Sequence, residues 1–373
     1  MRSGWRVGSL FDIPLFIDPS WLGVLVLIAI PRGLLWQANF PQWGVALAYS
    51  MGVVMALLLF GSVVLHELGH SLVAKAQGIK VSSITLFLFG GIASIEQESK
   101  TPGKAFQVAI AGPAVSLVLA LLLGAVAYAI PDPTNAINVL AVNLALTNLI
   151  LALFNLIPGL PLDGGNILKA IVWKITGNPY KGVVFASRVG QFIGWIAIAT
   201  GLIPLVLFGS FGSFWNLLIG WFLLQNAGKA AVSATVQEKL KGLTVADAVT
   251  PNSPVISGDL SLREFADQSI LSNGNWQRFL VTDDQGQLIG AIALDDLKIV
   301  PSTRWLKMHV KDLMQPIETA VVQSSQSLLE AVMLLEQQQR STLPVIRDNG
   351  VLVGILEKAA ILNLLQIKAQ ATA

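Results

Sequence analysis

The feature that most constrains this chain is a long run without charged side chains, from Gly33 to Leu65, that ends in His66-Glu67-Leu68-Gly69-His70. Such a run predicts a membrane helix that continues into the motif. Residues four apart lie on one face of a helix, so His66 and His70 can present two imidazole nitrogens to one metal ion. Glu67 lies beside that face, where a carboxylate can act as a general base on water. The alternative, two histidines and a solvated glutamate at the membrane surface, is disfavoured because ionisable groups beside lipid-length sequence mark function.

Charge divides the chain of 373 residues in two. Up to Lys241 there are 14 Lys+Arg and 8 Asp+Glu, whereas the remaining 132 residues contain 10 Lys+Arg and 14 Asp+Glu. The first part is therefore apolar and basic and the second is acidic, which gives no reason to expect a nucleic-acid partner. The chain has no cysteine, so any metal must be held by nitrogen and oxygen atoms.

The apolar segments predict a polytopic α-helical membrane protein with about six transmembrane helices. We expect spans at residues 20–38, 43–65, 105–130 and 137–157, and two more within the uncharged stretch 189–228, divided by a turn at 209–213. Residues 7–18 alternate apolar and turn residues and predict short strands. Residues 81–95, which are rich in β-branched and aromatic side chains around Phe89-Gly90-Gly91, predict strand and turn.

The distribution of basic residues predicts how the chain is oriented in the membrane. Six spans put both termini on one side, and 13 of the 14 Lys+Arg before residue 242 fall on that side, with Arg32 alone on the other. By the positive-inside rule that side is the cytosol. Asp12 and Asp18 interrupt the N-terminus, which does not read as a cleavable signal peptide. We therefore expect a multi-pass protein of a bacterial-type cell membrane with both termini and the tail in the cytosol.

Asp163 is the candidate third ligand. It is the only charged residue between Asp132 and Lys169, and it follows a segment that Pro158 and Pro161 keep out of a regular helix. Irregular backbone at membrane depth is tolerated where it lines a cavity. An aspartate there can complete a His-His-Asp zinc site with an open fourth position. The alternative is that Asp163 caps the helix that follows Gly164.

These motifs resemble those of the site-2 protease family of intramembrane zinc metalloproteases. The resemblance rests on HELGH at 66–70, NLIPGLPLDGG at 155–165 and Phe89-Gly90-Gly91 between them, and it covers about residues 1–235. It implies one zinc ion held by the positions of His66, His70 and Asp163, with Glu67 as general base.

The resemblance also implies that Asn155 lies in the active-site region and that Gly90-Gly91 helps to align the substrate as an extended strand. Two positions depart from the family pattern. Ser116 stands where an asparagine is frequent, and Asn166 stands where an arginine commonly follows the glycines. These departures concern auxiliary polar contacts and not the metal site.

Residues 242–373 contain an internal repeat, since Phe279–Asp283 recurs as Leu343–Arg347. Each half reads as a helix (260–271 and 327–339), two short strands and a closing helix, which predicts a soluble α+β tail. The tail resembles a tandem pair of cystathionine-β-synthase (CBS) domains, at 242–308 and 309–373, a module that senses adenosine nucleotides. His309, between the halves, is most simply a surface residue.

The nucleotide motif of that family, Gly-x-x-Ser/Thr-x-x-Asp, is incomplete in both halves. The first half gives Gly290, Ala293 and Asp296, which leaves Asp296 as the candidate nucleotide-binding residue. The second half keeps neither polar side chain. A weak adenine-nucleotide site and a CBS pair that packs into a homodimer without nucleotide are equally good interpretations.

The sequence therefore predicts a zinc metalloendopeptidase that cleaves a membrane-spanning segment of another protein, with a cytosolic CBS pair as regulatory module. Its partners would be that substrate and the lipid bilayer. A CBS-gated transporter or channel, in which HELGH forms an ion or substrate site, is the main alternative, but the membrane part shows no repeated halves. A catalytically dead scaffold is disfavoured by the intact Glu67.

Overall fold

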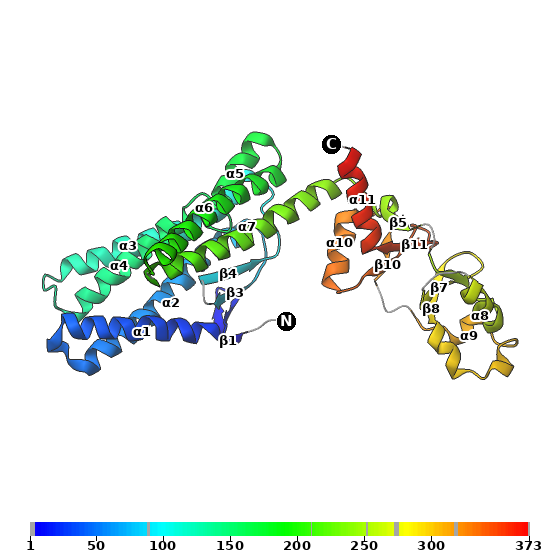
Figure 1. The fold of residues 1–373 in the computed structure, drawn as a ribbon, viewed down its shortest axis with the longest axis horizontal. Coiled ribbons are helices and arrows are strands. Elements are labelled where there is room, and N and C mark those ends of the chain that lie inside the picture. Colours follow the sequence, from blue (N-terminus) through cyan, green and yellow to red (C-terminus); the bar gives the residue numbers. More distant parts are fainter. Residues whose placement is uncertain are drawn as a thin grey trace. The chain divides into compact units, whose positions relative to one another are not determined.

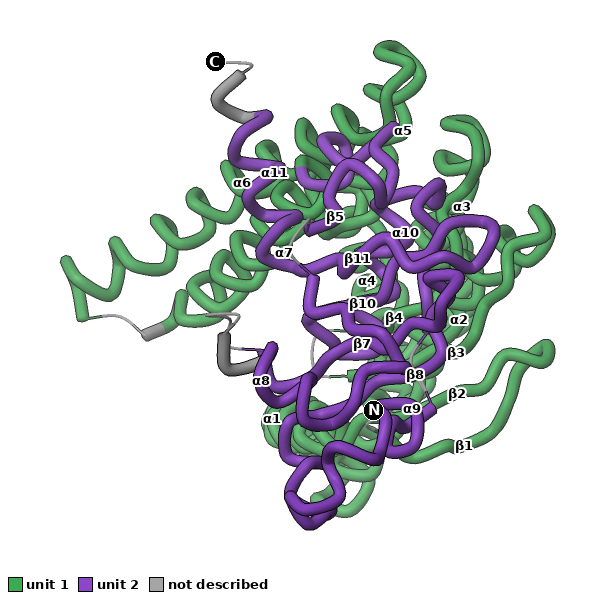
Figure 2. The backbone as a smooth tube through the Cα atoms, turned by 90° about the vertical axis from the view of Figure 1, so that its right-hand side faces the viewer, with its two compact units in different colours: residues 1–235 green, residues 236–373 purple. Residues whose placement is uncertain are grey.

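The computed structural model describes residues 4–87, 90–209, 211–250, 253–271, 276–316 and 320–371. Phe89 of the expected strand-and-turn segment and Ser210 of the expected hinge lie outside these ranges. The chain forms two compact units, Met1–Thr235 and Val236–Ala373, which Figure 2 shows in green and purple.

Five helices of the first unit are long and apolar enough to cross a membrane, within the described residues. Figure 1 shows them as α1 (Ser20–Asn39), α2 (Gly44–Ala76), α3 (Pro102–Ala129), α4 (Ala136–Asn155) and α6 (Pro179–Phe208). The expected sixth span coincides with α7 (Phe214–Leu240), which is long enough but less apolar. Gln225, Asn226 and Lys229 interrupt its hydrophobic run, so α7 does not meet the composition of the other five.

Capping residues fix where several helices start. The side chain of Thr101 accepts a hydrogen bond from the backbone N–H of Lys104 at the start of α3, and Asn135 accepts one at the start of α4. Asn178 does the same for α6, while Gly177 ends the short helix α5 (Asp163–Thr176) in the left-handed conformation. Each cap satisfies backbone groups that a helix end leaves unpaired.

A four-stranded sheet packs against α2. Its strands are β1 (Trp5–Leu10), β2 (Ile13–Ile17), β3 (Val81–Phe87) and β4 (Gly90–Ile95), in the order β1-β2-β3-β4. The strands expected within 7–18 and 81–95 are thus confirmed. The core between sheet and helix consists of Ile13, Val64, Leu68, Ile84 and Leu86. The strand β4 is at the edge of this sheet, paired with β3 and next to α2.

Small residues let α2 approach its neighbours closely. A Cβ on Gly52 would lie 2.5 Å from the carbonyl oxygen of Ala29 in α1. A Cβ on Gly69, inside the HELGH motif, would lie 3.0 Å from the carbonyl oxygen of Ala111 in α3. Small residues at helix contacts allow backbones to pack closely in membranes. The helix that carries both histidines is therefore held tightly against α3.

The second unit contains two small sheets. One has the order β6 (Val255–Ser257), β7 (Arg278–Thr282) and β8 (Leu288–Ala293), with the helix α8 (Leu262–Leu271). The other has the order β5 (Val249–Thr250), β11 (Leu352–Glu357), β10 (Thr342–Ile346) and β9 (Val322–Gln323), with α10 (Leu328–Gln337) and α11 (Lys358–Ala371). The helix and two strands expected in each half are present, so the tail has the expected α+β fold.

One expectation for the tail holds only in part. The first half closes with 3₁₀-helices at residues 294–299 and 302–304 and not with an α-helix like α11. Pro301 interrupts this segment, and proline cannot donate the backbone hydrogen bond that a continuing helix needs. The tryptophan that follows, Trp305, instead donates its indole N–H to the carbonyl oxygen of Val300.

The two halves of the tail also exchange their leading segments. Leu240, Val245 and Ala248 precede the first sheet in the chain but are buried in the core built around Leu328 and Leu343. Conversely, residues 310–315 join the other core, where Ala291 and Gln315 exchange two backbone hydrogen bonds. The packing of each half thus depends on residues from the other half of the repeat.

Candidate metal centre

His66 and His70 lie one turn apart on α2, and both side chains are buried, with exposed fractions of 4% and 7%. The α-helix continues through the motif to Ala76. The two imidazole rings lie 5.1 Å apart between centroids. Since the spacing of four residues brings both rings to the same face, their Nε2 atoms point toward one place beside the start of α5.

Asp163 is the first residue of α5, and its carboxylate lies between the two histidines. Oδ2 is 3.1 Å from Nε2 of His66, and Oδ1 is 3.3 Å from Nε2 of His70. The three side chains offer ligand atoms within 4.8 Å of one another. The N-cap of α5 is Leu162, whose apolar side chain makes no capping hydrogen bond. The carboxylate therefore faces the histidines and does not cap the helix.

Two glycines after Asp163 explain why α5 can start so close to the preceding turn. A Cβ on Gly164 would collide with the carbonyl oxygen of Leu156, and a Cβ on Gly165 would collide with the backbone of Gly159. Only glycine fits at these positions. The LDGG sequence thus folds the proline-containing segment tightly against the helix and presents Asp163 at its first turn.

The outer nitrogens of the two imidazoles are held by α3. Nδ1 of His66 is 2.9 Å from the hydroxyl oxygen of Ser116, and Nδ1 of His70 is 2.7 Å from the carbonyl oxygen of Val108. Between them in the helix, a Cβ on Gly112 would collide with Nε2 of both rings. One face of α3, with residues spaced by four, therefore fixes both rings and leaves room at their inner edge.

The hydrogen bond to Val108 determines which nitrogen of His70 is free to bind a metal ion. A carbonyl oxygen only accepts, so Nδ1 of His70 must carry the proton. In the neutral ring, Nε2 then presents a lone pair toward the carboxylate of Asp163, a repulsive contact that a cation between them relieves. Two imidazole nitrogens and one carboxylate oxygen form a zinc donor set with an open fourth position. The residues fit zinc.

Glu67 points into a cavity of about 650 Å³ that the three candidate ligands also line. Its carboxyl group forms a hydrogen bond with the backbone of Ala93 in β4. A Cβ on Gly91 would collide with the Glu67 side chain, so the glycine gives that side chain its space. The general-base candidate therefore lies between the candidate metal site and the edge strand.

The other residues singled out in the sequence fall in two places. Gly90, Gly91, Asn155 and Asn166 all line the cavity that contains Glu67. Asp296 lies in the second unit, where its carboxylate accepts a hydrogen bond of 2.8 Å from the backbone N–H of Ala293.

Two partners of the histidines were not identified as such from the sequence. Ser116 stood out only as a departure from the family pattern, although it is fully buried and contacts His66. The spacing of Ser116 and Gly112 along one helix face carried a signal that could have revealed the contact. The carbonyl of Val108 had no side-chain signal at all.

Both parts of the chain are similar to known proteins. The protein-family model described as "Peptidase family M50" matches residues 54–132 and 133–197. The protein-family model described as "CBS domain" matches residues 245–301 and 310–367. The "Putative zinc metalloprotease sll0528" of Synechocystis is 53% identical over 99% of this chain and 97% of its own length. The "Putative zinc metalloprotease Rip3" of Mycobacterium tuberculosis is 32% identical over 98% of this chain and 94% of its own.

Among solved structures, the "Site-2 Protease from Methanocaldococcus jannaschii" is similar with 30% sequence identity and a TM-score of 0.45. The match covers 61% of this chain and 95% of that one.

The apolar helices and the relatives define a multi-pass membrane protein with metalloprotease activity. The chain belongs to peptidase family M50, the site-2 protease family, and its tail is a CBS domain pair.

Proposed function

We propose that this protein is an intramembrane zinc endopeptidase that cleaves membrane-spanning segments of other proteins. The observation that carries the proposal is the convergence of His66, His70 and Asp163 at one point between helices of membrane-spanning length. Ionisable side chains in such surroundings are costly and are retained where they act.

His66, His70 and Asp163 would hold the zinc ion, and Ser116 and the carbonyl of Val108 would orient the two imidazoles. Bound zinc would supply Lewis-acid polarisation of the scissile carbonyl and activation of water. Glu67 would take a proton from the attacking water as the C–O bond forms. It would then deliver that proton to the amide nitrogen as the C–N bond breaks.

The edge strand β4 provides a place for the substrate backbone. A transmembrane helix hides its carbonyl groups in internal hydrogen bonds, so the segment to be cleaved must unwind before attack. An unwound segment can add to the edge of a sheet through backbone hydrogen bonds. Gly91 and Ala93 of β4 both contact Glu67, so a segment along this edge would pass the general base.

The decisive experiment compares the purified wild-type chain with Glu67→Gln. The variant should keep about one zinc per chain, because Glu67 is not a ligand, while proteolysis falls by roughly 10²–10⁴, as for loss of a general base. Zinc is measured by atomic emission and cleavage by mass spectrometry of a transmembrane peptide. Full proteolysis by the zinc-loaded variant would exclude this mechanism. Ion flux through proteoliposomes without proteolysis would favour a transporter.

We further propose that both termini and the tail are cytosolic. The support is the 13-to-1 distribution of basic residues, which requires α7 to cross the membrane despite its polar side chains. Because the chain has no cysteine, single cysteines can be labelled without background. A cysteine at Pro133 should react with an impermeant thiol reagent added outside cells, and one at Gln285 should not. The reverse pattern would overturn the orientation.

The tail is proposed to regulate access to the site, more by packing within a homodimer than by tight nucleotide binding. The support is that, of the polar side chains of the two nucleotide motifs, only Asp296 is present. Regulation by a ligand would require it to favour one arrangement of the tail over another. Sedimentation in detergent of the full-length protein, compared with a variant that lacks residues 242–373, tests whether the tail forms the dimer.

A further inference from the structure

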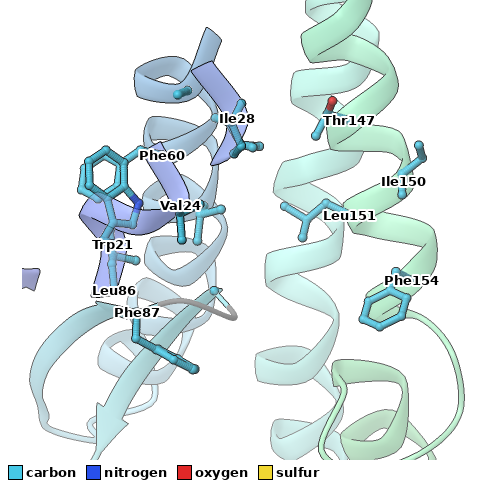
Figure 3. A pocket seen from close by; sticks show the side chains of 14 residues that line it. Trp21, Val24, Ile28, Phe60, Leu86, Phe87, Thr147, Ile150, Leu151 and Phe154 are labelled. Atoms are coloured by element: carbon cyan, nitrogen blue, oxygen red, sulfur yellow. The ribbon is translucent and has the colours of Figure 1, made fainter. Parts of the chain in front are cut away.

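A second cavity, of about 300 Å³, lies between α1, α2 and α4 beside the one that contains Glu67. Figure 3 shows Trp21 and Phe60 on one side, and Thr147, Leu151 and Phe154 of α4 across from them. The rings of Trp21 and Phe60 meet edge to face, 4.4 Å apart between centroids. The hydroxyl of Thr147 donates to the carbonyl oxygen of its own helix at Asn143, so it offers its methyl group to an apolar occupant.

This apolar cavity adjoins the catalytic cavity. Four residues line both: Val63, Phe87, Gly90 and Leu151. Val63 lies one turn before Glu67 on α2, and Gly90 directly precedes Gly91, whose position faces the Glu67 side chain. The apolar cavity thus meets the catalytic cavity at the start of the edge strand, next to the general base.

A hydrogen bond between α1 and α4 lies just beyond the end of the apolar cavity that is farther from Glu67. Arg32 is one turn after Ile28 on α1, and Asn143 is one turn before Thr147 on α4. The guanidinium of Arg32 donates to Oδ1 of Asn143 over 2.8 Å. The lining on α2 runs from Ala56 to Val63, a separation of seven residues or about 10 Å of helix. The cavity, here called the apolar tunnel, therefore extends about 10 Å along α2 and adjoins the catalytic cavity at one end.

We propose that this tunnel is a specificity subsite that receives one large apolar side chain of the substrate. The inference rests on the proposed function. A helix with its side chains is about 10 Å wide and would not fit in this volume, whereas a leucine, methionine or phenylalanine side chain would.

The strand β4 sets the position of that side chain. Gly90 lies where the two cavities meet and Ala93 contacts Glu67, a separation of about 10 Å at the rise of a strand. A substrate segment along β4 would thus place the side chain within three residues of the cleaved bond.

The test uses synthetic transmembrane peptides of thirty residues that differ only by Ala, Leu or Phe at one of the three positions on either side of the centre. Wild-type protein should cleave the Phe or Leu peptide about tenfold or more faster than the Ala peptide at one position, because burial of a large apolar side chain favours its transition state. The variant Thr147→Phe fills the tunnel and should reduce this preference to about threefold or less. The matched control Leu146→Phe adds the same ring at a neighbouring position, 55% exposed, and should leave the preference unchanged.

A second measurement does not depend on cleavage. The Glu67→Gln protein is mixed with a peptide that carries p-benzoylphenylalanine at the preferred position, or at each of the six positions if no peptide is cleaved. Irradiation should attach the peptide to tunnel residues such as Val24, Phe60 or Leu151, mapped by mass spectrometry. Adding Thr147→Phe should reduce the yield roughly tenfold, and adding Leu146→Phe should not.

The outcomes separate this inference from the proposed function. Absence of cleavage of every peptide counts against the endopeptidase, while the crosslinks still decide the subsite. Crosslinks outside the tunnel, or an unchanged preference in Thr147→Phe, would overturn the subsite alone. A phospholipid that wild-type protein retains at one per chain, and that Thr147→Phe loses in native mass spectrometry, would show that an acyl chain occupies the tunnel and would also overturn it.

Discussion

Two aspartates at the start of a helical segment, one in each unit, use their carboxylates in opposite ways. Asp163 begins α5 in the membrane unit and gives both oxygens to the histidines of α2, while its own helix has no side-chain cap. Asp296 lies in the first turn of a 3₁₀ segment of the tail and accepts a hydrogen bond from the backbone of Ala293, three residues earlier.

The difference is the one expected between a candidate metal ligand and a helix cap. A carboxylate that caps its own segment has found its partner locally, and this interaction is worth only about 1 kcal/mol. A carboxylate that does not cap its helix and instead contacts residues almost a hundred positions away in the chain is expected to take part in a stronger interaction, here the candidate metal site. The predictions below test this contrast, from the largest expected effect to the smallest.

Replacing Asp163 by alanine should lower zinc affinity by about 100-fold or more, since it removes a direct ligand. The matched change Asp296→Ala should leave one zinc per chain. Metal content of both variants, purified in detergent and dialysed against a weak chelator, checks this. Equal zinc content in the two variants would mean that Asp163 is not a ligand and that the contrast between the two aspartates is wrong.

Replacing Ser116 by alanine should lower zinc affinity by about 10- to 100-fold, because Nδ1 of His66 loses its hydrogen-bond partner. Ser187→Ala is the control, since the hydroxyl of Ser187 is also buried but has no hydrogen-bond partner within the described residues. Competition with a chromogenic chelator gives both affinities. A loss of the same size in Ser187→Ala would assign the effect to general destabilisation.

Adenine nucleotides should bind weakly to the tail. Loss of a charge-assisted hydrogen bond costs on the order of 1.5–3 kcal/mol, so the second motif should bind at least about tenfold more weakly than an intact one. Calorimetric titration of residues 236–373 with ATP, ADP and AMP measures this. Starting the fragment at Val236 retains Leu240, which is buried in its core. Tight binding at two sites, or binding indifferent to Asp296→Ala, would refute the interpretation of the motif.

The smallest effect concerns Asp247, a third aspartate that caps its own segment. Hydrogen bonds from the backbone N–H and hydroxyl of Thr244 lower its pKa below the ordinary value of 3.8. A lowered pKa in the folded state contributes stability that is present above pH 3.8 and is lost as the pH falls through the folded value.

Asp247→Asn should therefore flatten the acid limb of the stability profile of residues 236–373 and cost about 0.5–1 kcal/mol at neutral pH. Thermal unfolding between about pH 2.5 and pH 6 checks this. Asp295→Asn, with a side chain that is 83% exposed, is the control and should change little. An unchanged acid limb in Asp247→Asn would show that the cap is not formed.

Much of the membrane unit could be predicted because its chemistry is sparse. When nearly every side chain is apolar, a lone Asp163 or a pair of histidines four apart stands out, and the structure brings them together. Ser116 and the carbonyl of Val108 were missed because hydroxyls and backbone groups occur everywhere and show their role only through packing.

The tail shows the opposite limit. The sequence shows its internal repeat. It does not show that Leu240 and Val245 pack into the core of the other half, because that packing depends on contacts between residues distant in the chain. Similarly, the sequence alone does not decide whether α7 crosses the membrane, because its length favours a span and the polar residues near Asn226 disfavour one. Local patterns predict elements, whereas the partners of an element depend on the whole fold.

The position of the histidines along α2 has a consequence for the products. His66 is 22 residues from the start of α2 at Gly44, or about 33 Å of helix, which is close to the full thickness of the hydrocarbon core. Cleavage at that depth would divide a substrate span unequally. One fragment would keep almost the entire membrane segment and stay in the bilayer, whereas the other would carry a short apolar stub that anchors it poorly. The proposed reaction would therefore release one side of its substrate into the water.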